Sequence, residues 1–167
     1  MMRLQTATGL VAGVLGCALV AHAQDSWQEN DVVLPGPVQR SQLIPFDMSS
    51  RTELQFSVDA SSISVGSDRV LRYVLVARSG SGAENILYEG LRCETGEARN
   101  YARWNAPEQR WVPYSGSAPW RPLSGVAASL PAARLAYLAF CEGRTPTEPM
   151  ERLLADLRRG GKNVGQR

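Results

Sequence analysis

The residues able to do acid–base or nucleophilic chemistry are few, and the beginning of the chain carries some of them. Residues 1–23 have the pattern of a secretory signal: Arg3, then an apolar run, then an Ala-His-Ala sequence ending at Ala23. Cleavage there would remove His22, which is the one histidine, and Cys17. We therefore expect no Ser-His or Cys-His nucleophile and no imidazole acid–base step.

Carboxylate chemistry remains available. Two carboxyl groups about 5–9 Å apart can hydrolyse a glycosidic bond. Acidic residues that could supply such a pair are Asp59, Asp68, Glu84, Glu89 and Glu94. Two carboxylates in a chain of this size are common by chance, so glycan hydrolysis is an alternative hypothesis. Asp68 also suits a turn, and Glu89 suits an ion pair with Arg72 or Arg92.

Metal, cofactor and nucleic-acid sites are not indicated. Zinc would need two more ligands beside the remaining cysteines, no segment matches a calcium loop, and the one lysine, Lys162, follows no phosphate-binding glycine pattern. The net charge of +2 does not indicate the basic surface that nucleic-acid binding requires. With 44% hydrophobic and 20% charged residues among 167, the sequence predicts one globular domain without a transmembrane segment.

Cys93 and Cys141 remain after cleavage, and we expect them to form a disulfide. They enclose about 49 residues, and the chain-entropy model assigns such a loop roughly 4 kcal/mol. Their spacing is far wider than that of a redox pair, so a structural role is favoured.

Aromatic residues gather between positions 101 and 120 of the sequence. With two neighbouring arginines, they form the predicted binding set: Arg92, Tyr101, Trp104, Trp111, Tyr114, Trp120 and Arg121. Exposed together, the rings would stack on a glycan or a proline-rich peptide, and the guanidinium groups would recognise an anion. The alternative is that the rings are buried as core and loop anchors.

Strand patterns dominate the middle of the chain. Residues 24–50, which include Pro35, Pro37 and Pro45, predict an extended arm on the surface. Alternation and β-forming residues then predict five strands, over residues 54–58, 69–78, 85–93, 99–104 and 110–114.

The hairpin between the second and third of these strands has a predicted register. A two-residue loop at Gly80-Ser81 would place Val74 opposite Leu87 and Arg72 opposite Glu89. The register therefore predicts a buried Arg72–Glu89 pair.

Helical patterns follow the strands. Residues 127–140 predict a helix that packs on the sheet and completes a disulfide-stapled domain over residues 51–142. Residues 143–159 predict a linker and an amphipathic helix, capped by Thr147, and residues 160–167 a disordered tail. The apolar stripe of that helix is Met150, Leu153, Leu154 and Leu157. This stripe could pack on its own domain or recruit a partner, which makes an assembly factor a further alternative.

The expected location is the periplasm. A free product beginning at Gln24 is favoured, although the sequence before Cys17 is a passable lipobox, which would give a lipoprotein anchored there. The apolar run continues beyond Cys17, which weighs against the lipid.

Three segments resemble the CNP-like "cryptic protein" family of exported Gram-negative proteins. They are SISVGSDRV over residues 62–70, RYVLV over 72–76 and YEGLRC over 88–93. The resemblance covers residues 27–141 and implies a single periplasmic domain, and it carries no catalytic residues. We therefore expect an α+β fold with an antiparallel sheet of about five strands, one packed helix and a C-terminal amphipathic helix. The expected function is non-enzymatic binding of a cell-envelope component.

Overall fold

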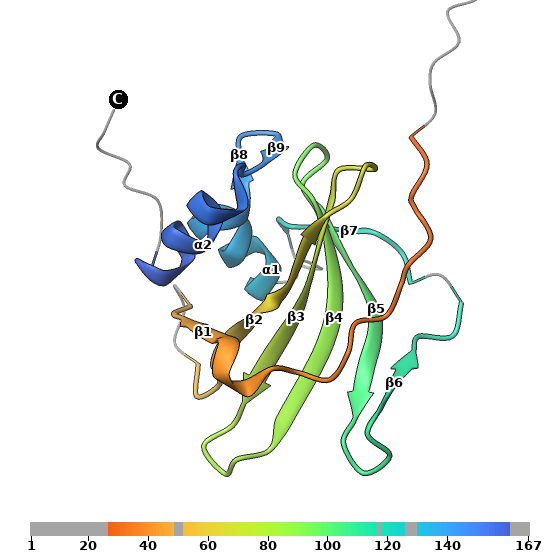
Figure 1. Cartoon of the computed structure of the whole chain (residues 1–167), viewed down its shortest axis with the longest axis vertical. Helices are drawn as coiled ribbons and strands as arrows, with labels where there is room; N and C mark the ends of the chain where they lie inside the picture. The colour runs from red at the N-terminus through yellow and green to blue at the C-terminus, as the bar shows by residue number, and fades with distance from the viewer. Residues whose placement is uncertain (1–26, 49–51, 117, 126–129, 161–167) are drawn as a thin grey trace, which may run out of the picture.

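The computed structural model describes residues 27–48, 52–116, 118–125 and 130–160. The predicted signal, the lipobox at Cys17 and the predicted tail beyond Gly160 lie outside the described residues. The described chain is an α+β fold built on an antiparallel sheet, with helices on one face and the extended arm on the other (Figure 1).

The sheet is a meander in which six strands follow one another in sequence order. A short seventh strand pairs with β5, and a two-stranded ribbon stands apart, so the strand count exceeds the expected five. The strands of the sheet are β1 (Leu43–Phe46), β2 (Gln55–Val65), β3 (Val70–Arg78), β4 (Glu84–Arg92), β5 (Glu97–Asn105), β6 (Arg110–Pro113) and β7 (Arg121–Pro122), and the ribbon is β8 (Cys141–Glu142) with β9 (Thr145–Pro146). The strand β1 lies within the segment expected to be an irregular arm.

The register of the β3–β4 hairpin differs from the prediction by one residue. Leu71 lies opposite Leu91, Tyr73 opposite Glu89 and Arg72 opposite Gly90. The loop is longer than two residues because Gly82 adopts φ +85° and its N–H donates to Ser79 O. A turn closed by a residue in this left-handed conformation adds one residue to the loop, and a shift of one residue moves side chains to the opposite face.

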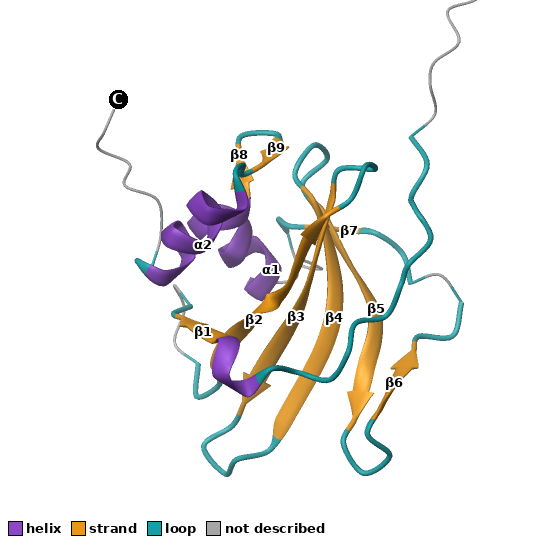
Figure 2. Cartoon of the chain, viewed as in Figure 1, coloured by secondary structure: helices purple, strands orange, loops and turns teal. Residues whose placement is uncertain are grey.

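Four helical segments complete the fold (Figure 2). They are η1 (Arg40–Gln42), α1 (Leu130–Leu135), η2 (Ala136–Phe140) and α2 (Met150–Arg158). Helix α2 begins after Pro149 without a side-chain cap, and the Thr147 hydroxyl is buried without a hydrogen bond, so the predicted Thr147 cap is wrong. None of the helices in the described ranges is long and apolar enough to cross a membrane.

The main core lies between the helices and the sheet. Leu135, Phe140, Leu153 and Leu157 are fully buried there against residues such as Leu71 of β3. The apolar stripe of α2 therefore packs on its own chain, with Met150 and Leu154 half-buried at the edge of the same core. This packing supports the interpretation of the stripe as part of the domain.

The predicted disulfide is confirmed. Cys93, directly after β4, bonds to Cys141, which begins β8, and their Cα atoms are 5.5 Å apart. The bond joins the sheet to the end of η2, as the sequence indicated.

The second core lies on the opposite face of the sheet, beneath the arm. Figure 1 shows the arm crossing the sheet in front of β4 and β5, away from the helices. Its side chains Val32 and Val38 pack against buried residues that include Tyr88 and Trp111. One end of this face is thus apolar and aromatic, and the other end carries the charged groups described below.

Candidate functional site

Three arginines lie at one end of the arm-covered face. The strand pairing sets Arg72 of β3 and Arg99 of β5 on either side of Gly90 of β4, and Arg92 belongs to the next row of the same face. We call the three residues the arginine cluster. Antiparallel pairing places side chains that are far apart in sequence within reach of one ligand.

Gly90 leaves room in the middle of this row. A Cβ atom added at Gly90 would lie 2.3 Å from Tyr101 Oη and 2.7 Å from two carbons of its ring. A register shift in the β4–β5 pairing, just after Tyr88, directs Tyr101 across this space. The phenol therefore reaches the arginine cluster because β4 has no side chain at this point.

Replacing Gly90 with alanine is expected to displace Tyr101 and to destabilise the fold by about 1–3 kcal/mol, the usual cost of overpacking. Urea unfolding followed by tryptophan fluorescence measures the change. Gly80→Ala is the matched control, since a Cβ there meets nothing within 4 Å, and we expect it to change stability by less than about 0.5 kcal/mol. Equal effects of the two substitutions would contradict the close approach of Tyr101.

Asp68 fixes the orientation of Arg72. Its carboxylate oxygens accept hydrogen bonds from Arg72 Nη1 at 3.1 Å and Nη2 at 2.6 Å, in a bidentate pair. It also accepts from the backbone N–H groups of Asn30 and Val70. Burial acts to raise the pKa of Asp68, but the hydrogen bonds from Arg72 and these N–H groups outweigh it and hold the pKa below its ordinary value.

Glu29, from the arm, places a carboxylate at the centre of the cluster. Arg99 Nη1 donates to Glu29 Oε2 at 2.5 Å, Tyr101 Oη donates to Oε1 at 2.5 Å, and Arg72 Nη2 lies 3.8 Å from Oε1. Burial, together with the hydrogen bond to Glu29, raises the pKa of Tyr101, so the phenol stays protonated and donates. The cluster thus binds a carboxylate through two cations and one hydroxyl.

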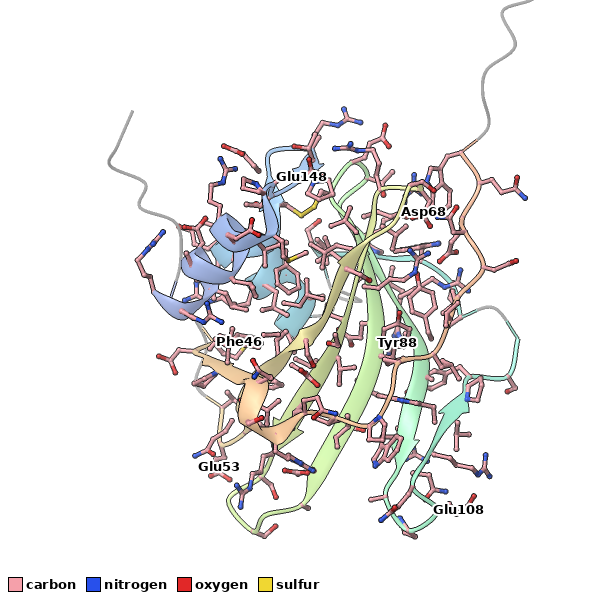
Figure 3. All side chains as sticks on the ribbon, viewed as in Figure 1. Phe46, Glu53, Asp68, Tyr88, Glu108 and Glu148 are labelled. Carbon is pink, nitrogen blue, oxygen red and sulfur yellow. A yellow bond between two sulfur atoms is a disulfide. The ribbon has the colours of Figure 1, made fainter. Side chains whose placement is uncertain are left out.

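Two tryptophans extend the site beside Arg92. The Arg92 guanidinium carbon lies 3.5 Å from the ring centroid of Trp27, and Trp27 meets Trp120 edge to face at 6.0 Å. The guanidinium carbon of Arg99 lies 5.6 Å from the Trp120 ring centroid. Cation–π contacts at these distances stabilise the charged guanidinium groups in their positions beside the rings. Figure 3 shows the start of the arm beside Asp68, and Tyr88 lies further along the same face.

Two donors of the cluster are not used by the carboxylates. The Nε atoms of Arg72 and Arg99 are buried and make no hydrogen bond within the described chain. Buried donors are almost always paired in native proteins, and an unpaired one costs about 1–3 kcal/mol. The arginine cluster therefore has hydrogen-bond donors beyond those that bond to Glu29 and Asp68.

The predicted aromatic and arginine set divides into three groups. Arg92 and Trp120 lie in or beside the arginine cluster, Trp104 and Trp111 pack in the second core beneath the arm, and Tyr101 belongs to that core while its hydroxyl reaches the cluster. Trp111 Nε1 donates to Gly36 O of the arm. Tyr114, at 41% exposure, and Arg121 are open to solvent. The rings do not form one exposed shelf, because the arm covers their middle.

The predicted Arg72–Glu89 pair is wrong. Arg72 faces the arm and pairs with Asp68, while Glu89 points into the main core and accepts a hydrogen bond from Tyr73 Oη at 2.8 Å. Consecutive strand residues face opposite sides, so the one-residue register difference separates the two. Burial raises the pKa of Glu89 to about 7, and the Tyr73 hydrogen bond offsets only part of that effect.

The other carboxylates proposed for hydrolysis have structural partners or face solvent. Buried Asp59 accepts from Gln39 N and Ser61 N, and Glu84 pairs with Arg40. Glu94 is exposed in the turn after β4. In the described ranges, no three His, Cys, Asp or Glu side chains are placed to hold a metal ion.

Sequence reasoning missed three residues of the site: Trp27, Glu29 and Arg99. Glu29 and Arg99 are 70 positions apart, and their contact depends on the path of an arm without strand periodicity. The sequence carries no local signal for this contact.

Comparison with known proteins gives the relationship of the chain. It is similar to Cryptic neisserial protein 1 of Neisseria gonorrhoeae, with 29% identity over 102 residues, or 54% of this chain and 50% of the relative. The chain thus spans about half the length of that curated relative. No solved structure matches it significantly. The model of the CNP1-like family matches residues 22–158, and the chain belongs to that family.

Proposed function

We propose that this protein is an exported, non-enzymatic binding protein that recognises an acidic group of a cell-envelope component at the arginine cluster. The observation that carries the proposal is the Glu29 carboxylate, which Arg99, Tyr101 and Arg72 surround. A site that holds the chain's own carboxylate has the charge and the donors to hold another one.

Charge balance supports an anionic ligand. Without Glu29, three guanidinium groups would face the carboxylates of Asp68 and Glu97, of which Glu97 lies 3.8 Å from Arg92. The partial burial of the cluster reduces screening by water, so each charged hydrogen bond there is worth about 1.5–3 kcal/mol. The unpaired Nε donors add capacity for a ligand with more than one acceptor.

Export is supported by the signal-like pattern of residues 1–23 and by the Cys93–Cys141 disulfide. Disulfides persist in oxidising compartments such as the bacterial periplasm. A non-enzymatic role is supported by the partners of the carboxylates, since Asp59, Asp68 and Glu89 are buried and hydrogen-bonded.

A hexaglutamate peptide is a suitable probe of the site, with hexaglutamine as the uncharged control. We expect Glu29→Gln protein, in which the internal carboxylate is neutral, to bind hexaglutamate and not hexaglutamine by isothermal titration calorimetry. Adding Arg99→Gln removes the charged hydrogen bond that Arg99 donates and should raise Kd about 10- to 100-fold.

Arg103→Gln is the matched control, because Arg103 is an exposed arginine of the same strand. It should leave Kd within about twofold of the Glu29→Gln value. Equal affinity for the two probes, or equal loss with Arg99→Gln and Arg103→Gln, would show that the cluster does not recognise carboxylates.

A further inference from the structure

We infer that the arm over residues 27–38 is an internal occupant of the arginine cluster, and that an extended segment of a partner protein, with an aromatic residue before an acidic one, replaces it. This inference rests on the proposed function and specifies both the partner and the control of access. In this proposal the arm covers the cluster reversibly, and the partner segment resembles the arm in sequence.

The way in which the arm is held indicates that it can leave. Among the described residues, no backbone-to-backbone hydrogen bond joins residues 27–38 to the sheet. Besides the Glu29 hydrogen bonds and the packing of Val32 and Val38, the arm is held by separate contacts such as Trp27 Nε1 to Asp68 O at 2.9 Å and Asn30 Nδ2 to Ser67 Oγ at 2.9 Å. A segment that shares no ladder with the sheet can open without unfolding it, at less than the global unfolding free energy.

Exposure of part of the arm is consistent with its release. Val33 is 80% exposed, and Trp27 and Leu34 are each 38% exposed. The strands beneath are well buried by comparison, since Val74 and Ala102 are at most 1% exposed. Release of the arm would thus expose a face that is apolar at one end and cationic at the other, while the main core on the far face stays closed.

The contacts of the arm favour a polypeptide ligand over a lone anion. Asp68 Oδ2 accepts from the backbone N–H of Asn30, and Trp111 Nε1 donates to the backbone carbonyl of Gly36. Trp27 stacks against Arg92, and Glu29 lies two positions later at Arg99. An incoming segment with this spacing would make the same contacts in extended form.

The partner segment can bind more favourably than the arm. Within the described chain, the Nε donors of Arg72 and Arg99 have no acceptor while the arm is in place. A second acidic or amide side chain in the partner would accept from them and recover part of the cost of their burial. The arm has the advantage of being tethered, which corresponds to a millimolar effective concentration, so a partner at micromolar concentration must bind about 1,000-fold more tightly than the arm sequence would as a free peptide.

A reversible covalent lock tests the exchange. Asn30→Cys with Ser67→Cys joins the arm to the turn between β2 and β3, at side chains that already touch. The probe is a labelled peptide with the sequence of residues 27–38, WQENDVVLPGPV, and the protein is titrated to about 1 mM because the tethered arm competes at a similar effective concentration. We expect oxidation of the pair, verified by mass, to weaken peptide binding at least tenfold by fluorescence anisotropy. Mild reduction should restore the binding, with wild type and both single-cysteine variants as controls.

Glu29→Gln tests the same competition without a crosslink. Loss of its charged hydrogen bonds weakens the arm, so the affinity for the peptide should rise about tenfold. Asp31→Asn is the matched control, since Asp31 is an exposed acidic residue of the same arm, and it should leave the affinity unchanged. A peptide in which glutamine replaces the glutamate should bind more weakly.

The outcomes separate the two proposals. Equal peptide affinity for the locked and reduced proteins, with dependence on Arg99 preserved, would overturn the exchange of the arm and leave the acidic-ligand site standing. If the Glu29→Gln protein binds neither hexaglutamate nor this peptide, the acidic-ligand site itself is overturned. Weaker binding in the locked state together with stronger binding by Glu29→Gln would support both.

Discussion

Replacing Cys93 and Cys141 together with alanine is expected to lower the free energy of unfolding by about 4 kcal/mol, because the disulfide closes a long loop in the unfolded chain. The two cysteines are separated by 48 positions in sequence and join the end of β4 to the end of η2. Such a loss is comparable to a large part of the stability of a small domain. Guanidinium unfolding of the protein at constant pH measures it.

Wild-type protein reduced with dithiothreitol is the natural comparison for the double variant. It should lose nearly as much stability, since reduction removes the crosslink and keeps the sulfur atoms packed. A difference of less than about 1 kcal/mol between oxidised and reduced wild type would contradict a structural role for the bond.

Raising the pH from 5 to 8 is expected to destabilise the protein through Glu89. Its pKa is about 7 in the folded protein, against an ordinary value of 4.5. The folded state therefore holds a proton that the unfolded state releases, so the stabilisation is complete below pH 4.5 and is lost as the pH rises through 7. The full loss from this one group is about 3 kcal/mol.

Glu89→Gln should abolish this pH dependence and make the protein more stable than wild type at pH 8. Glutamine keeps an oxygen that can accept from Tyr73 Oη but carries no charge to bury. Glu84→Gln on the same strand is the control, and it should retain the decline of wild type, because Arg40 holds the pKa of Glu84 below its ordinary value. Parallel urea titrations at several pH values compare the three proteins, and a flat wild-type profile would be inconsistent with a buried Glu89 carboxyl.

Strands and helices of this protein were predictable where the hydrophobic periodicity of a segment agrees with turn-forming residues at its ends. Residues 69–78 and 85–93 were expected as strands and are observed as β3 and β4 within one residue. The amphipathic stripe of α2 and the cysteine pair were likewise visible in the sequence. These features are local, or follow from redox chemistry, so no knowledge of the tertiary structure was needed.

The register and the site depended on details that the sequence leaves open. Gly82 takes a left-handed conformation that lengthens the β3–β4 loop by one residue. Arg72 therefore pairs with Asp68 and not with Glu89, the predicted partner. The arm has no periodicity that would place Glu29 against Arg99 and Tyr101. Long-range contacts made by irregular segments follow from packing, which single-sequence patterns do not encode.

The meander order of the sheet has a consequence for the order of assembly. Each of the first six strands pairs with its neighbour in sequence, so hairpins can form progressively while the polypeptide is made from its N-terminus. The segment around Trp27 and Glu29 is made before all of them, yet its partners include Arg92, Arg99 and Trp120. The earliest-synthesised part of the described chain therefore cannot take its place until most of the sheet has been made.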